Sequence, residues 1–531
     1  MTQLLRNPRI ALTALLLIGF FIRVVGLEYC PPAMNSDELL KTFDGASVYL
    51  TGMDHHGAHW PLFFKQSGEY SPPLYIYFSG LFSAPFGVNP YTLRLPSVLL
   101  GTLCILMAYL AASRWRGQAT GIIAAALVML SPWNIHYSRI GWEAISLIPL
   151  QLCGLWLFLR WTQENRKTDL FLSAAAFALT TYAYPTARLF TPILGVGLLI
   201  CFYSKLKEKN KQSALGAGLF LLLQIPLAYA LLTNYEAMQA RWNFVSVFNH
   251  PDGITLALSN FIKHLTPQFL FITGNVNPGH QLPGGLALLV LTPFLVLGLI
   301  ALYQRKDRSD WLMLIWFLAF AIPSSLTYDR FDPASMPNAL RSVNGMPVLE
   351  LISAAGVCWL MNRIPKEKKK SVGILIAAAI TANAGYIGYL SATVYPIEAA
   401  RQNQYGMDQA VQYAEANKEK YERIVFSHTV RLHPVSLAVF SGRKPSPFSA
   451  QDYPKYIIPF YHYTPIYSDF RTDVYQRFAG QNLNSIARWY NLAPGRNLLI
   501  ALPHEIGGAT PLHEIRSLDG SVAYSIYETD N

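Results

Sequence analysis

Charged residues are scarce in this chain: only 14% of its 531 residues are Asp, Glu, Lys or Arg, whereas 52% are hydrophobic. Soluble globular proteins carry about a quarter charged residues. The deficit excludes an intrinsically disordered protein and an ordinary cytosolic domain. Together with a mean hydropathy of +0.25 and long apolar runs, it points to a membrane protein.

Cysteine is scarce as well, with five residues in the whole chain. Cys104, Cys153, Cys201 and Cys358 fall inside apolar runs, where a thiol behaves as a small buried hydrophobe. Only Cys30 lies in a polar segment. A single thiol has no partner for an internal disulfide, so the parts outside the membrane are expected to fold without one.

The chain also lacks the motifs of nucleotide, redox and zinc sites: no CxxC, GxGxxG, Walker loop or internal repeat stands out. The formal net charge is +11, from 42 Lys and Arg against 31 Asp and Glu. From residue 398 onward the sequence has 13 of each kind, so the surplus lies entirely in the apolar part. A surplus placed between membrane spans excludes nucleic acid as a partner.

About 20 mostly apolar residues are needed for a helix to cross a bilayer. Eleven stretches reach or approach this length, and they predict a polytopic α-helical membrane protein with about eleven transmembrane helices. The stretches are 9–27, 94–112, 119–132, 143–160, 168–182, 187–203, 213–232, 284–303, 310–324, 340–361 and 371–390.

Basic residues are unevenly distributed among the polar connectors. If the N-terminus is cytoplasmic, the connectors on the cytoplasmic side hold 19 Lys and Arg residues. The segments on the other side of the membrane are longer, yet up to residue 397 they hold only 10. This is the positive-inside pattern, and an odd span count puts the C-terminus outside the cytoplasm of a multi-pass plasma membrane protein. Residues 23–28 offer no small-residue cleavage site, so the first span is not expected to be a cleavable signal peptide.

Three long segments then lie outside: 28–93, 233–283 and the tail from 394. The tail predicts a small α/β domain, since Met407, Ala410, Val411 and Ala414 have helical spacing. Short apolar runs at 424–426 and 498–502 predict buried strands, and 522–527 predicts a final edge strand. The sequence therefore predicts a membrane domain, 1–393, that contains the first two outer loops, followed by an extracytoplasmic domain, 394–531.

The first outer loop, 28–93, concentrates polar side chains beside the membrane. It contains Asp37-Glu38, Asp54-His55-His56-Gly57 and Glu69-Tyr70, and an apolar stretch at 74–86 draws it onto the membrane surface. Carboxylates held at such a surface resist dehydration, so they are expected to be partnered or functional.

Several stretches of the chain resemble a known enzyme family. They are Asp37-Glu38, Glu69–Tyr75, Arg94–Ser97, Ser131–Arg139, Tyr184–Arg188, Phe269–Asn275 and Ile322–Thr327. In their order and topology they resemble glycosyltransferase family 39, whose GT-C-fold members include protein O-mannosyltransferases and the lipid A aminoarabinose transferase. The resemblance covers about residues 9–390. The aminoarabinose branch has a lysine after the glutamate, whereas Tyr70 follows Glu69 here, so the resemblance does not extend to specificity for that sugar or for lipid A.

The resemblance implies transfer of a hexose or pentose from a polyprenyl-phosphate donor to an acceptor hydroxyl, with inversion, on the outer face of the membrane. Asp37 matches the family's catalytic Asp, and a hydroxyl needs such a carboxylate to take its proton. The leaving phosphate needs cations instead, and Arg94 is the first candidate, followed by Arg139 and Arg188. The alternative for these arginines is snorkelling to lipid phosphate.

The remaining loop residues have two interpretations each. Glu69 binds a divalent cation, the acceptor or the sugar, or else it is a surface acid. His55, His56 and Tyr70 are candidates to line the cavity, although a histidine pair is often simply solvated. Glu38 is expected to orient its neighbour rather than react. Mg²⁺ or Mn²⁺ on Asp37 and Glu69 fits carboxylate chemistry, but no diagnostic ligand spacing is present.

Two other functions compete with the transferase. A transporter or flippase of lipid-linked saccharides would place ionisable residues along a path through the membrane, and only Glu350 lies clearly within a span. A ligase or polymerase of lipid-linked glycans shares the outer-face geometry and stays open. The acceptor is a protein, a lipid or a glycan of the cell envelope.

The orientation is tested by a reporter fused after Asn531. We expect activity only from a reporter that works outside the cytoplasm, because the basic connectors hold the N-terminus inside and the span count is odd. A cytoplasmic reporter fused at the same place serves as the control. Activity of that second fusion would contradict an odd number of spans.

Overall fold

The computed structural model describes residues 7–66, 69–235, 242–243, 245–275, 277–328, 336–458, 490, 492, 494–503 and 505–530. The chain divides into two compact units. The first consists of Met1–Leu27, Pro72–Tyr75 and Arg94–Thr393. The second consists of Glu28–Ser71, Ile76–Leu93 and Val394–Asn531.

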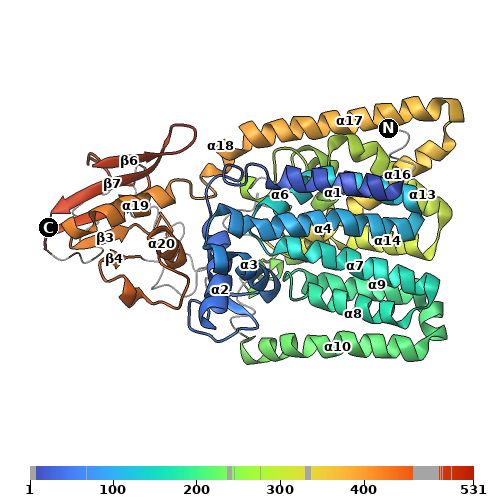
Figure 1. The fold of residues 1–531 in the computed structure, drawn as a ribbon, viewed down its shortest axis with the longest axis horizontal. Helices are drawn as coiled ribbons and strands as arrows, with labels where there is room; N and C mark the ends of the chain where they lie inside the picture. The colour runs from blue at the N-terminus through green and yellow to red at the C-terminus, as the bar shows by residue number, and fades with distance from the viewer. Residues whose placement is uncertain are drawn as a thin grey trace. The chain divides into compact units, whose positions relative to one another are not determined.

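The first unit is helical, and its long helices run side by side (Figure 1). Packed pairs include α13 with α16, α7 with α8, α8 with α10, α5 with α16 and α9 with α14. Its helices are α1 (Pro8–Val24), most of α4 (Pro90–Arg116), α5 (Gln118–Leu130), α6 (Pro132–Arg139), α7 (Ala144–Glu164), α8 (Lys167–Thr180), α9 (Ala187–Glu208), α10 (Asn210–Thr233), α12 (Gly253–His264), α13 (Thr292–Arg305), α14 (Arg308–Ala319), α15 (Ile322–Ser325), α16 (Met346–Arg363) and α17 (Lys366–Thr393).

A helix covers most of each of the eleven apolar stretches predicted as spans. Among the described residues six helices are long and apolar enough to cross a membrane on their own, or seven if the bent pair α5–α6 forms one span. Helices such as α1, α8 and α14 are shorter. Large apolar side chains point outward from α10 and α17, with Leu232 81% and Leu375 69% exposed. Such exposure is expected for helices that face lipid.

The bend between α5 and α6 measures 55° and begins at Pro132. Proline has no N–H, so the carbonyl of Val128 loses its i+4 donor and accepts from the N–H of Ser131 at 3.4 Å. The N–H of Trp133 donates to the carbonyl of Leu286 instead of Met129. The fully buried Arg23 of α1 supplies donors in their place. Its guanidinium lies 3.2 Å from both the Val128 and the Met129 carbonyl oxygens. The break is therefore held to α1 by hydrogen bonds.

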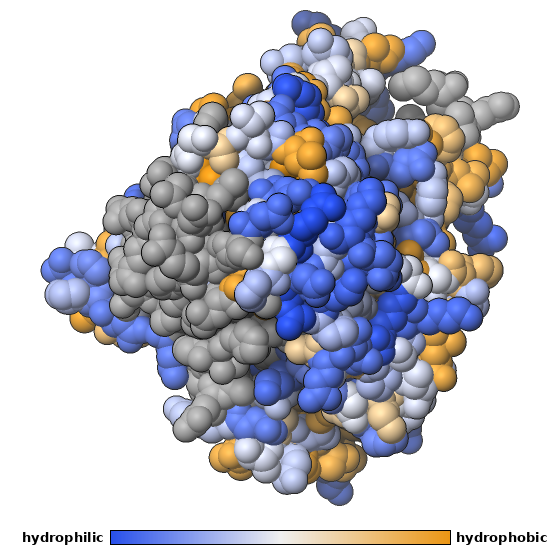
Figure 2. Space-filling model, turned by 90° about the vertical axis from the view of Figure 1, so that its left-hand side faces the viewer, coloured by the Kyte–Doolittle hydropathy of each residue, from blue (hydrophilic) through white to orange (hydrophobic). Residues whose placement is uncertain are grey.

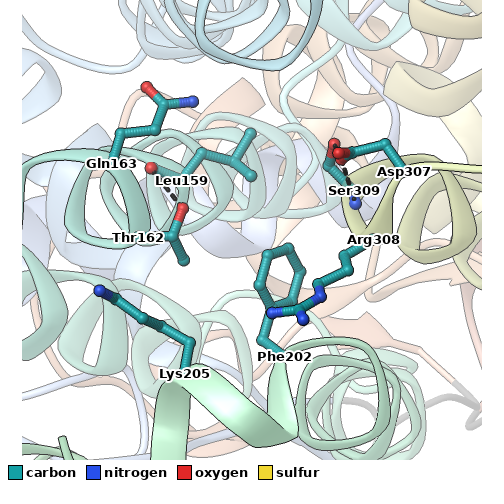
Figure 3. A pocket seen from close by; sticks show the side chains of 8 residues that line it. All are labelled: Leu159, Thr162, Gln163, Phe202, Lys205, Asp307, Arg308 and Ser309. Atoms are coloured by element: carbon teal, nitrogen blue, oxygen red, sulfur yellow. Dashed lines mark hydrogen bonds between the residues drawn. The ribbon is translucent and has the colours of Figure 1, made fainter. Parts of the chain in front are cut away.

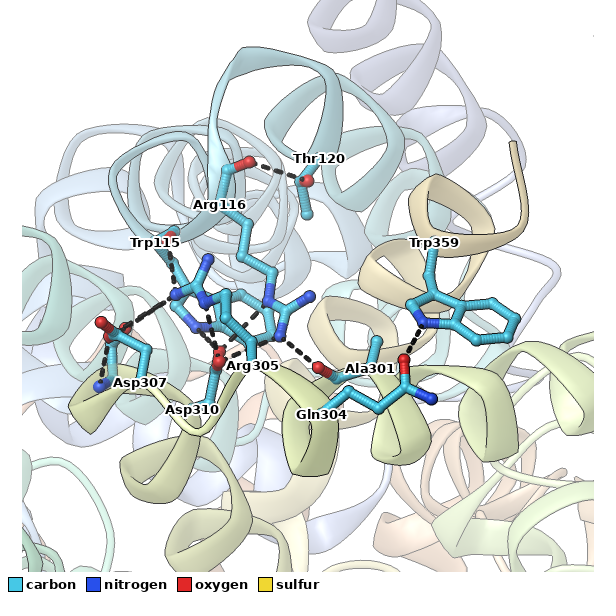
Figure 4. Close-up of polar contacts among 10 residues, drawn as sticks. Trp115, Arg116, Thr120, Ala301, Gln304, Arg305, Asp307, Asp310 and Trp359 are labelled. Atoms are coloured by element: carbon cyan, nitrogen blue, oxygen red, sulfur yellow. Dashed lines mark hydrogen bonds and ion pairs between the residues drawn. The ribbon is translucent and has the colours of Figure 1, made fainter. Parts of the chain in front are cut away.

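Opposite charges join three helices where α4 ends and α14 begins (Figure 4). The carboxylate of Asp310 is 1% exposed and accepts hydrogen bonds from Trp115 Nε1 at 2.9 Å, Arg116 Nε at 3.1 Å and Arg305 Nε at 2.8 Å. Arg116 also donates to the Ala301 carbonyl at 3.1 Å. A single carboxylate thus connects the ends of α4 and α13 with the start of α14.

The tail forms a five-stranded mixed sheet with helices beside it. The strand order is β4-β3-β5-β7-β6; β3 pairs in parallel with β4 and β5, and β7 pairs antiparallel with β5 and β6. The elements are α18 (Tyr395–Ala400), α19 (Met407–Asn417), β3 (Arg423–Phe426), α20 (Pro434–Phe440), β4 (Tyr456–Ile457), β5 (Arg496–Ala501), β6 (His513–Arg516) and β7 (Val522–Asp530).

The predicted helix at 407–414 and the strands at 424–426 and 498–502 are present. The prediction that 522–527 forms an edge strand is wrong, because β6 pairs with the outer side of β7. On the face that Figure 2 shows, hydrophilic side chains predominate over the surface not drawn in grey.

The first outer loop contains α2 (Ser36–Thr51), the hairpin strands β1 (Phe64–Gln66) and β2 (Glu69–Ser71), and α3 (Pro73–Phe86). Helices α2 and α3 approach closely at Gly45 and Gly80, where an added Cβ would collide with the backbone of the other helix. Only glycine permits this contact.

Most of this loop belongs to the same compact unit as the tail, whereas the sequence predicted that it would belong to the membrane domain. Leu39, Leu40 and Phe43 of α2 form a buried apolar cluster with Val435 and Ala438 of α20. The loop therefore folds against a segment almost 400 residues away in the sequence.

The network around Asp310 predicts a large effect of one substitution. Asp310→Asn removes the charge that pairs with Arg116 and Arg305, and breaking a buried pair costs about 3 kcal/mol. We expect a lower midpoint in thermal unfolding of the purified protein in detergent. The control is Asp307→Asn at an exposed helix cap, which asparagine also fills. Equal midpoints for the two variants would contradict the role of Asp310.

Candidate functional site

The predicted catalytic Asp37 lies in the first turn of α2. Asn35 caps this helix, and its side chain accepts from the N–H of Glu38 at 3.0 Å. The carboxylate of Glu38 in turn accepts from the N–H of Asn35 at 3.3 Å, which completes a capping box. Glu38 is fully buried, whereas Asp37 is exposed. No described residue forms a hydrogen bond or ion pair with the Asp37 carboxylate, so it is open to an incoming group.

Two residues on the same side of α2 were missed by the sequence analysis. Lys41 and Asp44 follow Asp37 by one and two helical turns, a spacing that places all three on one face. Lys41 is buried, and its Nζ lies 3.4 Å from the carbonyl oxygen of Asp37. The spacing of four and seven residues was the available signal. A buried cation thus lies beside the candidate base.

The tail holds the beginning of α2 in place. Ser36 Oγ donates to Gln404 Oε1 at 2.6 Å and lies 3.2 Å from Ser436 Oγ. The side-chain amide of Asn35 donates to Asn403 Oδ1 at 3.4 Å. Residues directly before Asp37 are therefore tied to two parts of the tail.

His55 is buried rather than solvated. Its Nδ1 lies 2.5 Å from Asp44 Oδ1, and Gln66 Nε2 donates to the other oxygen of Asp44 at 2.9 Å. Burial lowers the pKa of His55, but the charge and hydrogen bond of Asp44 outweigh it and raise the pKa above its ordinary value. His55 thus fixes the loop to α2.

Two more histidines gather around His55. The ring centroids of His55 and His56 are 3.9 Å apart, and that of His433 lies 6.5 Å from His55. Burial and the neighbouring His55 lower the pKa of His56 to about 4. Burial, followed by the charges of His55 and His56, lowers the pKa of His433 to about 3. His433 is neutral at pH 7, and its Nδ1 caps α20 by accepting from the N–H of Val435.

Glu69 and Tyr70 lie in β2. Their backbones pair with Gln66 and Lys65 of β1. The side chain of Glu69 lies outside the described part of the structure, so its predicted role stays a prediction. Tyr70 is half-buried.

Arg94 and Arg139 meet at the end of α1. Gly26 has a left-handed backbone with φ +67° and turns the chain there. Arg139 donates to the carbonyls of Ile22, Arg23, Val25 and Gly26 at 2.8–3.1 Å. The fully buried Arg94 donates to the carbonyl of Leu27. The Arg139 guanidinium thus caps a helix whose C-terminal dipole is negative, and Arg94 binds the turn that follows it.

Arg188 lies in the first turn of α9 and is half-buried, with its Nε 3.5 Å from the Thr181 carbonyl oxygen. The contact with Thr181 does not bring Arg188 to Arg94 or Arg139.

Two of the stretches that resemble the family meet in the first unit. Tyr75 Oη lies 2.7 Å from Ser97 Oγ, and Ser97 Oγ donates to the Ile140 carbonyl at 2.7 Å.

A metal site is not apparent in the described part of the chain. No group of three or more His, Cys, Asp or Glu residues there could hold a metal ion. Glu38, the acid next to Asp37, is engaged in its capping box. The expectation of Mg²⁺ or Mn²⁺ on Asp37 and Glu69 therefore stays a prediction.

The fold is that of the GT-C glycosyltransferases. The structure of ArnT from Cupriavidus metallidurans bound to undecaprenyl phosphate superposes with a TM-score of 0.59 at 12% identity and covers 97% of both chains. The oligosaccharyltransferase of Archaeoglobus fulgidus gives 0.56 at 14% identity, over 97% of this chain and 74% of its own. The arabinofuranosyltransferase AftD from Mycobacteria gives 0.51 at 14% identity, over 99% and 40%.

Within that class, residues 70–229 match the family described as dolichyl-phosphate-mannose-protein mannosyltransferase. This match and the GT-C fold confirm the resemblance to family 39 that the motifs indicated. The matched segment includes Tyr70, Arg94, Arg139 and Arg188. No curated protein matches the sequence.

The histidine cluster predicts that acid loosens the second unit. The folded pKa values of His56 and His433 lie below the unfolded value of about 6.5, so the unfolded chain binds more protons as the pH falls from 6.5 toward 4. Stability should fall by about 1 kcal/mol per pH unit in this window, chiefly through the buried His433, because His56 is exposed to solvent and contributes less. His55 has a raised pKa; its contribution is complete below pH 6.5 and is lost only as the pH rises above that value.

Hydrogen exchange of peptides around residues 50–60 and 430–440, corrected for intrinsic rates, measures this effect between pH 7 and 5. His433→Asn keeps a capping side chain but cannot titrate, so it should flatten the pH dependence. His513→Gln alters an exposed histidine and serves as the control. Protection that stays constant down to pH 5 in the parent protein would contradict the interpretation.

Proposed function

We propose that this protein is a membrane glycosyltransferase that moves a sugar from a polyprenyl-phosphate donor to an acceptor hydroxyl, with inversion. The observation that carries the proposal is the contrast between two adjacent acids. Glu38 is buried and occupied by the capping box, whereas Asp37 presents an exposed carboxylate without a described partner. The first turn of a helix suits a group that must stay ionised, since the dipole there is positive.

The similar structures support the class of donor. ArnT was solved with undecaprenyl phosphate, and the Archaeoglobus fulgidus oligosaccharyltransferase AglB with dolichol phosphate and an inhibitory peptide. By analogy we propose a polyprenyl phosphate as the lipid carrier here, and a protein, lipid or glycan as the acceptor. We place the site outside the cytoplasm, in agreement with the distribution of basic connectors.

The proposed reaction is a single displacement. The acceptor oxygen attacks the anomeric carbon while Asp37 takes its proton, and the bond from that carbon to the phosphate oxygen breaks. The phosphate leaves with the bonding electron pair and needs no general acid, because it is stable as an anion. Cations near the phosphate would stabilise the growing charge, and Arg94 remains the first candidate on chemical grounds.

A second candidate function is the transfer of a whole lipid-linked glycan. The likeness to an archaeal oligosaccharyltransferase favours it. Both functions use the same base and the same type of donor and differ in the size of the group transferred. Mass spectrometry of lipid that co-purifies with the protein decides between them, since it measures the saccharide on the carrier directly.

Replacing Asp37 tests the proposal. Asp37→Asn keeps the size of the side chain but removes the base, so turnover should fall by about 10²- to 10⁴-fold while donor binding survives better. Glu38→Gln keeps a capping residue at the same position and should lose far less. The measurement is transfer from the co-purified donor, with hydrogen exchange of α2 to show that the variants fold.

Three further variants complete this test. Glu69→Gln should fall between the other two, and if Glu69 binds a cation, excess Mg²⁺ or Mn²⁺ should restore part of the activity. Gln404→Ala releases Ser36 and should lower turnover without removing the base. Gln404→Asn is a milder change, since it keeps the amide, and it should lower turnover less. Near wild-type transfer by Asp37→Asn, with Glu38→Gln or Glu69→Gln inactive, would assign the base elsewhere.

A further inference from the structure

A pocket of ≈ 230 Å³ lies in the first unit, where α7 and α9 end and α14 begins (Figure 3). Buried Leu159 and Phe202 form its apolar part. Lys205 and Arg308 bring two cations to it from different helices, and Ser309 adds a hydroxyl. The connectors at this end of the helices are the basic ones that the sequence assigns to the cytoplasmic side.

The charges of this pocket are incompletely neutralised. The guanidinium of Arg308 forms no hydrogen bond or ion pair with any residue that the structure describes. Lys205 Nζ lies 3.7 Å from Glu208, but Glu208 is closer to Lys209, at 3.2 Å. The acid in the lining, Asp307, accepts from the N–H of Ser309 at 2.9 Å and lies 3.5 Å from Arg305. The pocket is therefore suited to an anion.

The surroundings favour an anion with an apolar tail. Both α7 and α9 are long and apolar enough to cross a membrane, so the pocket at their ends lies where lipid head groups meet the hydrocarbon. Leu159 and Phe202 give it an apolar wall beside the two cations. A phosphate that carries acyl chains can use both features, which a soluble phosphate cannot do.

We propose that this pocket binds the phosphate head group of an anionic phospholipid. The planar guanidinium of Arg308 holds two phosphate oxygens, Lys205 contributes a point charge, and Phe202 contacts the glycerol carbons. The acyl chains lie along α9. This site is independent of the proposed sugar transfer, because none of its residues is assigned to that reaction.

The test measures lipid binding to the full chain by native mass spectrometry after delipidation in detergent, with phosphatidylglycerol as the probe and phosphatidylcholine as the neutral lipid. The double variant Lys205→Gln with Arg308→Gln should weaken the tightest phosphatidylglycerol site about tenfold, since each basic residue at an anionic surface is worth several-fold. The matched control is Lys207→Gln with Lys211→Gln. It removes the same charge from exposed positions outside the pocket and should change binding less than about twofold.

Two results would overturn the proposal. Equal weakening by both double variants would mean that only the overall charge of this end attracts lipid. Displacement of phosphatidylglycerol by millimolar inorganic phosphate, with equal binding of phosphate alone, would mean that the pocket accepts a soluble anion. Hydrogen exchange of α9 and α14 in each variant shows whether the fold is kept.

Discussion

Backbone carbonyls inside a membrane must find hydrogen-bond donors, and three arginines supply them where helices of the first unit end or break. Arg23 donates to the carbonyls of Val128 and Met129 at the break before Pro132, Arg139 donates to carbonyls at the end of α1, and Arg94 donates to Leu27 just beyond that end. Because α1 packs on both α5 and α6, these bonds fix α1 against the bent pair. The position of the C-terminal end of α1, from which the chain continues into residues 28–93, depends on them.

These hydrogen bonds give Arg94 and Arg139 a structural role in addition to their predicted role of binding the donor phosphate. A guanidinium has five N–H donors, and part of each set already binds backbone carbonyls. A phosphate bound there would share the guanidinium with the end of α1. Substituting either residue would free buried carbonyls as well as remove a cation, so a loss of activity would not separate the two roles. The Asp37 carboxylate binds no described residue, so a loss of activity on its substitution would report on its chemical role more directly.

The helices could be predicted because lipid-facing surfaces leave long apolar runs in the sequence. The prediction that β7 lies at the edge of the sheet was wrong because its neighbour β6 is short and mostly polar, so the sequence shows no strand pattern there. At the candidate site, a motif pointed to Asp37, whose role stays a prediction, and the Asn35-x-x-Glu38 spacing of a capping box was visible in the sequence. The hydrogen bond from Ser36 to Gln404 joins residues 368 positions apart, and no local pattern reports such a contact.

The contacts of the tail connect it mechanically with the candidate base. Asn403, Gln404 and Ser436 bind the two residues that precede Asp37, and the histidine cluster joins the middle of the same loop to the start of α20. A displacement of about 1 Å at a reacting group can cost about a hundredfold in rate. A loop between two helices, without a disulfide to fix it, would not hold a carboxylate to that tolerance. Packing against a folded sheet domain restricts the loop near its beginning, at residues 35–36, and again at His55.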